Sequence, residues 1–225
     1  MVSYYPTMGH QSRARSADAK EARRAAILTA AAALFDRSTY GAVTMADVAR
    51  RSRLAKGTVF LYFPTKEAVF LDLLDGMLTE WLDALHDAVA RDDSRWSAAE
   101  LARTITDTLT ARTALSRLIP LCHGVLEKNV DDERLAAFKQ RLLRRLFGTG
   151  AVIELKLGLS RRGDGVRLLL FAWALIIGFG TQAEPAGAIA RVLARPEFEP
   201  LRLDFANDLR TALTVLINGF HRKAA

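Results

Sequence analysis

The residues of this chain best suited to chemistry are two lysines that flank a short run of glycine, hydroxyl-bearing and aromatic residues. Residues 54–66 are Leu-Ala-Lys-Gly-Thr-Val-Phe-Leu-Tyr-Phe-Pro-Thr-Lys. In a helix, Ala55, Val59 and Phe63 fall on one face at four-residue spacing, and that face can pack inward. The opposite side has no carboxylate and suits contact with a polyanion; it comprises Gly57, Thr58, Phe60, Leu61 and Tyr62, between Lys56 and Lys66. The alternative interpretation is a short buried helix without function.

A second short helix is predicted immediately before this segment. Thr44 and Asp47 have the spacing of a capping box, in which a hydroxyl caps the helix start and an acid three residues later reaches back. Residues 44–52 should therefore form a helix, followed by a turn of three or four residues. Its outer surface is made basic by Arg50, Arg51 and Arg53. Two short helices, a tight turn and a basic surface are typical of a helix-turn-helix DNA-binding unit, whose second helix enters the major groove.

The distribution of charge supports an anionic partner for this part of the chain. The 225 residues carry a formal net charge of +7. Residues 1–66 hold 11 Lys and Arg against 4 Asp and Glu, whereas residues 67–225 hold 21 of each. The whole excess therefore lies with the predicted helix-turn-helix, where release of counterions from phosphates would favour binding.

The sequence around this motif resembles the TetR family of bacterial transcription regulators. The family pattern Lys-Gly-Thr-aliphatic-Tyr-x-x-Phe-x-x-Lys-Glu matches residues 56–67, and the likeness extends over about residues 25–70 through Phe35, Thr44, Val48 and Ala49. Three positions depart from the pattern. Phe60 lacks the hydroxyl with which the family's usual tyrosine contacts a phosphate, Arg53 stands where a turn glycine is common, and Thr39 occupies a usual glycine position.

This resemblance implies an all-α fold with an N-terminal three-helix DNA-binding domain and a larger helical domain for effector binding and dimerisation. We expect a flexible arm over residues 1–17, the DNA-binding domain over 18–66 and the larger domain over 67–225. The arm is either a disordered tail or a basic segment that touches DNA. The expected DNA-binding residues are Thr44, Lys56, Gly57, Thr58, Phe60, Leu61, Tyr62 and Lys66.

A long helix is predicted to connect the two domains. It starts after Pro64 and Thr65, and its apolar stripe continues to about residue 91. Because amides at a helix start favour anions, Lys66 and those amides would form a phosphate clamp. Motion at the far end of one unbroken helix could re-aim the recognition helix.

Further helices fill the larger domain, and strand alternation does not persist anywhere in the chain. Ser97 and Glu100 form another capping box, Pro120 should kink or break a helix over residues 113–129, and Asp131 precedes the next helix. The last two long helices are expected at residues 166–183 and 204–221. The longest uncharged stretch, residues 168–183, has sixteen residues, which is short for a membrane span, so no membrane association is expected.

The last two long helices are the best candidates for a dimer interface. Two recognition helices about 34–36 Å apart would read a palindrome across one DNA turn. In the resembled family this helix pair forms a four-helix bundle with its symmetry mate; the alternative is that the core of one chain absorbs both helices. The expected interface residues are Phe171, Phe179, Leu209, Leu213, Leu216 and Phe220.

The resemblance also implies an apolar cavity in the larger domain, where a small molecule lowers DNA affinity. The expected wall residues are Cys122, His123, Leu126, Phe138, Leu142 and Trp173, and the expected ligand is largely apolar. The alternative for Cys122 is a small buried hydrophobe, for His123 a polar group with a partner, and for Trp173 a core residue. Neighbours on a helix diverge by about 100°, so Cys122 and His123 are not expected to share a metal site.

Motifs for catalysis, metal binding and nucleotide binding are missing: there is no HExxH, P-loop or GxGxxG. The one cysteine cannot form an internal disulfide, and residues 1–17 contain no apolar signal segment, so a reducing cytoplasm is expected. We therefore expect a homodimeric repressor, not an enzyme, without metal or cofactor, that a small apolar effector releases from a palindromic operator in double-stranded DNA. An architectural DNA-binding protein without effector control is the alternative.

Overall fold

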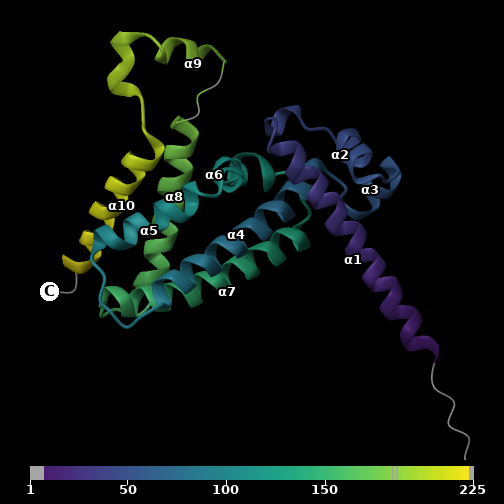
Figure 1. Cartoon of the computed structure of the whole chain (residues 1–225), viewed down its shortest axis with the longest axis horizontal. Helices are drawn as coiled ribbons and strands as arrows, with labels where there is room; N and C mark the ends of the chain where they lie inside the picture. The colour runs from purple at the N-terminus through teal and green to yellow at the C-terminus, as the bar shows by residue number, and fades with distance from the viewer. Residues whose placement is uncertain (1–7, 184, 186, 223–225) are drawn as a thin grey trace, which may run out of the picture. The chain divides into compact units, whose positions relative to one another are not determined.

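Helices form every regular element in the part of the chain that the computed structural model describes, which is the backbone of residues 8–183, 185 and 187–222 (Figure 1). The prediction of an all-α fold is confirmed. The chain divides into two compact units, Met1–Leu73 and Leu74–Ala225. Each unit has its own set of buried apolar side chains.

The first unit is built from three helices and the beginning of a fourth. They are α1 (Met8–Phe35), α2 (Met45–Ser52), α3 (Lys56–Tyr62) and α4 (Lys66–Ala90), with a 3-10 turn at Tyr40–Ala42. Helix α1 packs against α2, and α2 packs against α3. The fully buried side chains that join them include Ile27, Phe35, Val48, Val59 and Phe63. A small trihelical core of this kind holds α3 with one face inward and one outward.

Helix α1 begins ten residues earlier than the sequence indicated. The capping spacing at Asp18 predicted a start there, but the helix starts at Met8. No proline lies between Pro6 and Pro64, so nothing in the sequence forces a stop in this stretch. Of the expected flexible arm, residues 1–7 lie outside the described residues, and the backbone of residues 8–17 is helical.

The second unit contains the rest of α4 and the six helices that follow it. These are α5 (Ala98–Thr110), α6 (Thr113–Leu118), α7 (Asp132–Leu157), α8 (Asp164–Ala183), α9 (Gly187–Leu193) and α10 (Phe205–Arg222), with 3-10 turns at Ile119–Leu121 and Pro196–Leu201. Helix α10 packs against α5 and α8, and α7 packs against α8. The ends follow local sequence signals: the capping box predicted at Ser97 and Glu100 is present, and Asp131 caps α7.

Pro120 breaks the regular helix, as its lack of an amide hydrogen requires. Helix α6 ends at Leu118, a 3-10 turn follows at Ile119–Leu121, and Cys122–Leu126 forms one wide π-helical turn. Turns of this kind change the angle between successive side chains and are frequent at functional sites. In this turn the Glu127 amide donates to the Cys122 carbonyl at 3.0 Å, five residues earlier, which places Glu127 beside Cys122.

Glycine allows α7 and α8 to approach each other closely. A methyl group added at Gly150 of α7 would lie 2.8 Å from the backbone nitrogen of Val166 in α8. A side chain at Gly165 would meet the backbone of Gly150 in the same way. The crossing therefore brings backbone against backbone, which fixes the positions of the residues before Gly150 relative to α8.

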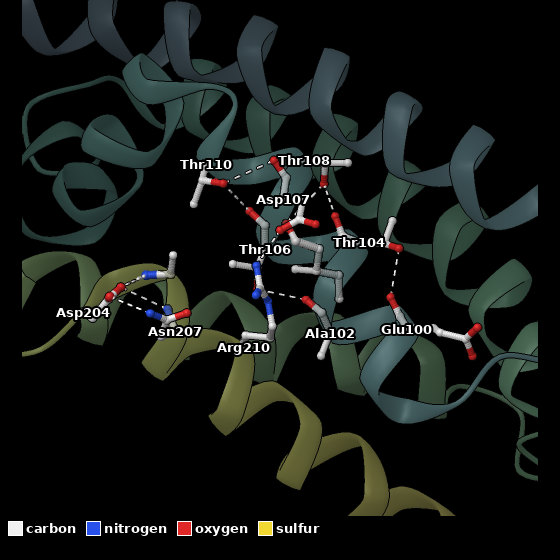
Figure 2. A network of polar contacts seen from close by, with 12 residues as sticks. Glu100, Ala102, Thr104, Thr106, Asp107, Thr108, Thr110, Asp204, Asn207 and Arg210 are labelled. Carbon is white, nitrogen blue, oxygen red and sulfur yellow. Dashed lines mark hydrogen bonds and ion pairs between the residues drawn. The ribbon is translucent and has the colours of Figure 1, made fainter.

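Figure 2 shows the polar groups of α5 and α10, where threonine hydroxyls bond within α5 and an ion pair connects the two helices. Thr104, Thr106, Thr108 and Thr110 each donate to the carbonyl oxygen four residues earlier, at 2.6–2.9 Å. Arg210 of α10 donates to Asp107 at 2.6 Å. The hydroxyls therefore bond within α5, and the Arg210–Asp107 ion pair connects α10 to α5, while Nε of Arg210 is buried without a hydrogen-bond partner among the described residues.

Helix α8 is long and apolar enough to cross a membrane by length and composition alone, because it begins at Asp164 and has 20 residues. Core helices of soluble proteins pass the same test. Only 22% of its most apolar window is buried within the described chain. Leu168, Leu169 and Ile176 are buried, whereas Leu170 and Phe171 are 48% and 44% exposed. One face of α8 thus lies in the core and the other is uncovered in a single chain.

Candidate nucleic-acid interface and ligand cavity

The outer face of α3 carries unusually exposed apolar side chains for a unit of this size. Leu61 is 86% exposed and Phe60 39% exposed, while Thr58 and Tyr62 are half-buried. The Lys56 ammonium lies 5.8 Å from the centre of the Phe60 ring, within the range of a cation–π contact. The face therefore presents an apolar tip beside a cation to whatever it meets.

The inner face of α3 is only partly the one predicted. Val59 and Phe63 are fully buried, as expected, but Ala55 is exposed. Ala55 is the N-cap residue of α3, with extended backbone angles (φ −61°, ψ 143°), and so lies outside the helical turn. The prediction for Ala55 was wrong because four-residue spacing applies only within the helix.

The hydroxyl of Thr44 is occupied by the predicted capping box. It accepts from the Asp47 amide at 3.2 Å and donates to the Asp47 carboxylate at 2.6 Å. These contacts with Thr44, and then Arg50, lower the pKa of Asp47 from its ordinary value. Thr44 therefore holds the start of α2 in this structure, and its predicted contact with DNA would require that cap to be shared.

Lys66 does not project from the unit as a phosphate clamp requires. Its ammonium donates to the backbone carbonyls of Tyr40 at 2.9 Å and Val43 at 3.0 Å, and lies 4.0 Å from the centre of the Tyr40 ring. Burial lowers its pKa, against the opposing effect of Glu67. We correct the assignment: Lys66 ties the 3-10 turn before α2 to the start of α4, where Thr65 accepts from the Ala68 amide.

The turn between α2 and α3 contains a left-handed residue. Arg53 has φ 58° and ψ 33°, the one positive φ among the non-glycine residues that the structure describes. Glycine adopts these angles without cost, whereas a side chain is strained there. The arginine is exposed, next to exposed Arg50 and Arg51. A strained arginine at this turn adds positive charge beside the N-terminus of α3.

The second unit encloses an apolar cavity of about 310 Å³, within the range of small-molecule sites. Its walls come from α4, α5, the π-helical turn, α7 and α8. The lining residues are Leu78, Trp81, Leu82, Ile105, His123, Lys139, Leu142, Leu143, Leu146, Leu169, Leu170, Ala172, Trp173 and Ile176. The Trp81 ring nitrogen donates to the Thr108 hydroxyl at 3.1 Å, which fixes this aromatic wall.

Half of the expected wall residues line the cavity. His123, Leu142 and Trp173 do so, whereas Cys122, Leu126 and Phe138 are absent from the lining and at most 1% exposed. The assignment of those three to the wall is corrected: they pack behind it, because the turn after Pro120 directs Cys122 and Leu126 into the core. Lys139 was missed, and no signal in the sequence distinguished it from the other cations of α7.

A polar cluster lies at one end of the cavity and is centred on Glu127. The Cys122 thiol and the Lys139 ammonium donate to Oε1 of Glu127 at 3.0 and 2.6 Å, and His123 Nδ1 lies 3.0 Å from Oε2. The Trp173 ring nitrogen donates to His123 Nε2 at 3.2 Å. Because an indole N–H can only donate, Nε2 must accept, and the imidazole proton is on Nδ1, facing Glu127.

This cluster also has the composition of a metal site, since Cys122, His123 and Glu127 offer ligand atoms within 4.8 Å of one another. The two side chains still diverge as expected, since Cys122 is buried and His123 is exposed, and they meet at different oxygens of Glu127. The hydrogen bonds among these side chains nevertheless satisfy them without a metal ion. Burial opposes ionisation of Glu127, but donation from Cys122, Lys139 and His123 lowers its pKa to about 2. Burial and the nearby carboxylate raise the pKa of the Cys122 thiol, which disfavours the thiolate that metals bind.

The expected dimer-interface residues are divided between core and surface. Leu209 and Leu213 are fully buried and Phe220 is 9% exposed, so these three belong to the core of the single chain. Their assignment to an interface was wrong, because α10 uses this face against α5 and α8. Phe179 and Leu216 are partly exposed and Phe171 is 44% exposed. A shallow apolar surface remains on α8 and α10, lined by Phe171, Ala174, Leu175, Ala212, Val215 and Leu216.

Sequence models of one family match both units of the chain. Residues 27–73 match the bacterial regulatory proteins of the tetR family, and residues 75–224 match the tetracyclin repressor-like C-terminal domain. The chain belongs to the TetR family. The predicted resemblance is thereby confirmed, and it extends from the helix-turn-helix to the second unit.

Curated relatives of this TetR-family chain are transcription regulators. The HTH-type transcriptional regulator YfiR of Bacillus subtilis is 30% identical over 135 residues, which are 56% of this chain and 65% of YfiR. The chain therefore spans slightly less than two thirds of that relative. The HTH-type transcriptional regulator EthR of Mycolicibacterium smegmatis is 36% identical over 56 residues, 25% of this chain and 26% of EthR.

Solved structures of TetR-family regulators share the fold. A regulator of the TetR/AcrR family from Thermobifida fusca aligns with a TM-score of 0.53 and 20% identity, covering 88% of this chain and 97% of its own. The regulator FadR of Bacillus subtilis, solved in complex with stearoyl-CoA, aligns with a TM-score of 0.50 and 16% identity, covering 86% and 97%. Proteins of this family are transcription regulators and not enzymes.

Proposed function

We propose that this TetR-family chain is a homodimeric repressor that binds a palindromic operator in the cytoplasm and that a small, largely apolar effector releases from DNA. The observation that carries the proposal is the outer face of α3, where Leu61 is 86% exposed between Thr58 and Tyr62. A large apolar side chain so exposed on a rigid helix gains little in the free protein. Against the thymine methyl groups of a major groove it would be covered.

The charge of the first unit supports the same interface. Positive residues surround the α2–α3 turn, including exposed Arg51 and Arg53, and Lys56 opens α3. These side chains would contact phosphates and position α3, while Thr58, Leu61 and Tyr62 would meet base edges. Gly57 is exposed, with nothing within 4 Å of its missing side chain, so it leaves room for close approach of the backbone.

Dimerisation would use the uncovered apolar face of α8 and α10. Val215 is 69% and Phe171 44% exposed, and both line the shallow surface between these helices. A second copy would cover this face and place two α3 helices on one palindrome, about one DNA turn apart. The proposed interface therefore no longer includes the buried residues Leu209, Leu213 and Phe220. It includes instead the surface residues Ala174, Leu175, Ala212 and Val215.

The cavity of the second unit would hold the effector. Helix α4 carries Lys66 near its start and the cavity residues Leu78, Trp81 and Leu82 further along. Because α4 is one continuous helix, a ligand that fills the cavity could shift the start of α4. Lys66 would pass this shift to the segment that precedes α2, since it binds the carbonyls of Tyr40 and Val43. Coupling of about 1–3 kcal/mol would relieve repression about 5- to 150-fold.

The decisive experiment selects bound DNA from a random pool with the full chain and then measures affinity for the selected palindrome. Lys56→Ala should weaken binding to all sequences alike and lower the salt slope by about one. Leu61→Ala and Thr58→Val should instead change sequence preference, with about 1–3 kcal/mol at stake for a good base contact. Lys128→Ala, an exposed lysine of the second unit, is the matched control and should change neither.

Two outcomes would overturn the proposal. If the pool yields no enriched palindrome, the chain is not a sequence-specific regulator. If Leu61→Ala and Thr58→Val bind every selected sequence as the wild type does, α3 is not the recognition helix.

A further inference from the structure

We propose that the effector is an amphiphile with an anionic head group, a carboxylate, which Lys139 binds at the polar end of the cavity. This inference rests on the proposed function, because it names the chemical class of the effector. It starts from the placement of the polar atoms in the cavity wall.

The cavity is apolar except at one end. Fourteen residues line it, and three of them direct polar groups to the same place: His123, Lys139 and Trp173. Trp173 and His123 contact each other, and His123 and Lys139 both contact Glu127. The remaining indole N–H in the wall, that of Trp81, is taken by Thr108. A ligand can therefore satisfy polar atoms only at this end.

The polar end is open to solvent. The side chains of His123 and Lys139 are 53% and 42% exposed. Leu143 and Leu170 of the apolar wall are similarly exposed, whereas Leu82 is 3% exposed and Ile105 is fully buried. A ligand placed in the cavity would bury its apolar body against Leu82 and Ile105 and keep its head group near Lys139. This division between a dry body and a partly hydrated head defines an amphiphile.

The sign of the head group follows from the hydrogen bonds around Glu127. Its carboxylate is 15% exposed and already receives three donors, from Cys122, His123 and Lys139. If Lys139 turned toward a ligand, the thiol and the imidazole would still satisfy Glu127. A cationic head group would be repelled by the Lys139 ammonium, and the neighbouring carboxylate already accepts from three donors. A carboxylate gains an ion pair that a neutral hydroxyl cannot form.

The test compares three ligands with the same alkyl body: decanoate, decanol and decylamine. Isothermal titration of the full chain should give decanoate about fivefold tighter binding than decanol, the size expected for one half-exposed ion pair. Decylamine should bind more weakly than either. Lys139→Met should remove the preference for decanoate over decanol. Lys128→Met makes the same change of charge outside the cavity lining and should keep it.

A second variant tests the same geometry in the opposite direction. Glu127→Gln removes the carboxylate that competes for Lys139 and should increase the preference for decanoate. The amide retains the size of the side chain, so this variant keeps most of the local packing, but its single oxygen can accept from only one of Cys122 and His123, which contact different oxygens of the carboxylate. The inference is overturned if wild-type protein binds decanol as tightly as decanoate, if it binds none of the three, or if Lys139→Met keeps the preference.

Release from operator DNA, measured in parallel, separates this inference from the proposed function. If decanol releases the protein as readily as decanoate, the head-group inference fails and effector control stands. If decanoate binds with the stated preference but leaves DNA affinity unchanged, the head-group inference stands and effector control by this ligand class fails.

Discussion

Single side chains in this protein have roles that their type alone does not show. Lys66 lies at the family's motif lysine, yet its ammonium is bound by the carbonyls of Tyr40 and Val43. Lys139 carries no motif, yet it is the cation that meets the cavity. Backbone carbonyls hold Lys66, whereas Lys139 is paired with Glu127 at 2.6 Å beside the cavity, so the surroundings and not the residue type set what each ammonium can meet.

Lys66→Met should destabilise the first unit by about 1–3 kcal/mol, because two part-buried carbonyls lose a charged donor. DNA affinity should fall, since the segment before α2 is released, but the salt slope should stay the same. Chemical denaturation and binding at several salt concentrations measure the two effects separately. A salt slope lowered by one, without loss of stability, would restore Lys66 as a phosphate contact.

Glu127 should make the stability of the second unit depend on pH in the acidic range. Its pKa in the folded chain is about 2, below its ordinary value of 4.5, so the folded state favours the ionised form. The resulting stability is present above the ordinary pKa and is lost as the pH falls through about 2. Between about pH 5 and 2 the wild type should lose more stability than Glu127→Gln, measured by denaturant unfolding. Equal losses in the two proteins would show that the three donors contribute nothing.

The positions of the helices depend on helix breaks and on close helix–helix contacts as much as on apolar stripes. Pro120 ends α6 and produces the π-helical turn that brings Cys122, His123 and Glu127 together. Gly150 and Gly165 allow α7 and α8 to cross at backbone contact, which places Leu142 and Leu146 against α8 at the cavity. The cavity therefore depends on three residues that do not line it.

Two glycines of α7 provide a matched test of the crossing. Gly150→Ala should destabilise the protein by about 1–3 kcal/mol, because its methyl group would overlap the backbone of Val166. Gly148→Ala meets nothing within 4 Å and should stabilise the same helix by about 0.5–1 kcal/mol. Thermal unfolding of both variants measures the difference. If the two shifts have the same sign, close approach of the helices does not explain Gly150.

At the scale of the whole molecule, the excess positive charge and the apolar face proposed for dimerisation lie in different units. The net positive charge lies in residues 1–66, and the uncovered apolar face lies on α8 and α10 of the second unit. Electrostatic attraction to DNA and hydrophobic association of two copies can therefore be changed independently. Salt would act on the first and leave the second largely intact.

Val215→Glu should convert the dimer into a monomer, because a charge would be buried at the proposed interface. Operator affinity should fall by several orders of magnitude, while the helical content stays unchanged. Ile189→Glu is the control, since Ile189 of α9 is similarly exposed, 63% against 69%, and lies outside this surface. Light scattering gives the mass of each variant. A dimer that persists in Val215→Glu would place the interface elsewhere.

The sequence by itself determined the local features of this protein. Caps at Thr44, Ser97 and Asp131 and the break at Pro120 follow from interactions within a few residues, which the chain order contains. The TetR-family motif and the positive charge of residues 1–66 were equally visible.

Only the tertiary structure decided which apolar face is covered and which polar group has a partner. Leu213 and Val215 are both apolar residues of α10, yet one is fully buried and the other 69% exposed. Lys66 and Lys139 are both lysines in long helices, and carbonyls 23 and 26 residues away bind the first. Burial and pairing depend on residues distant in the chain, so helical periodicity can identify the faces of a helix but cannot assign them.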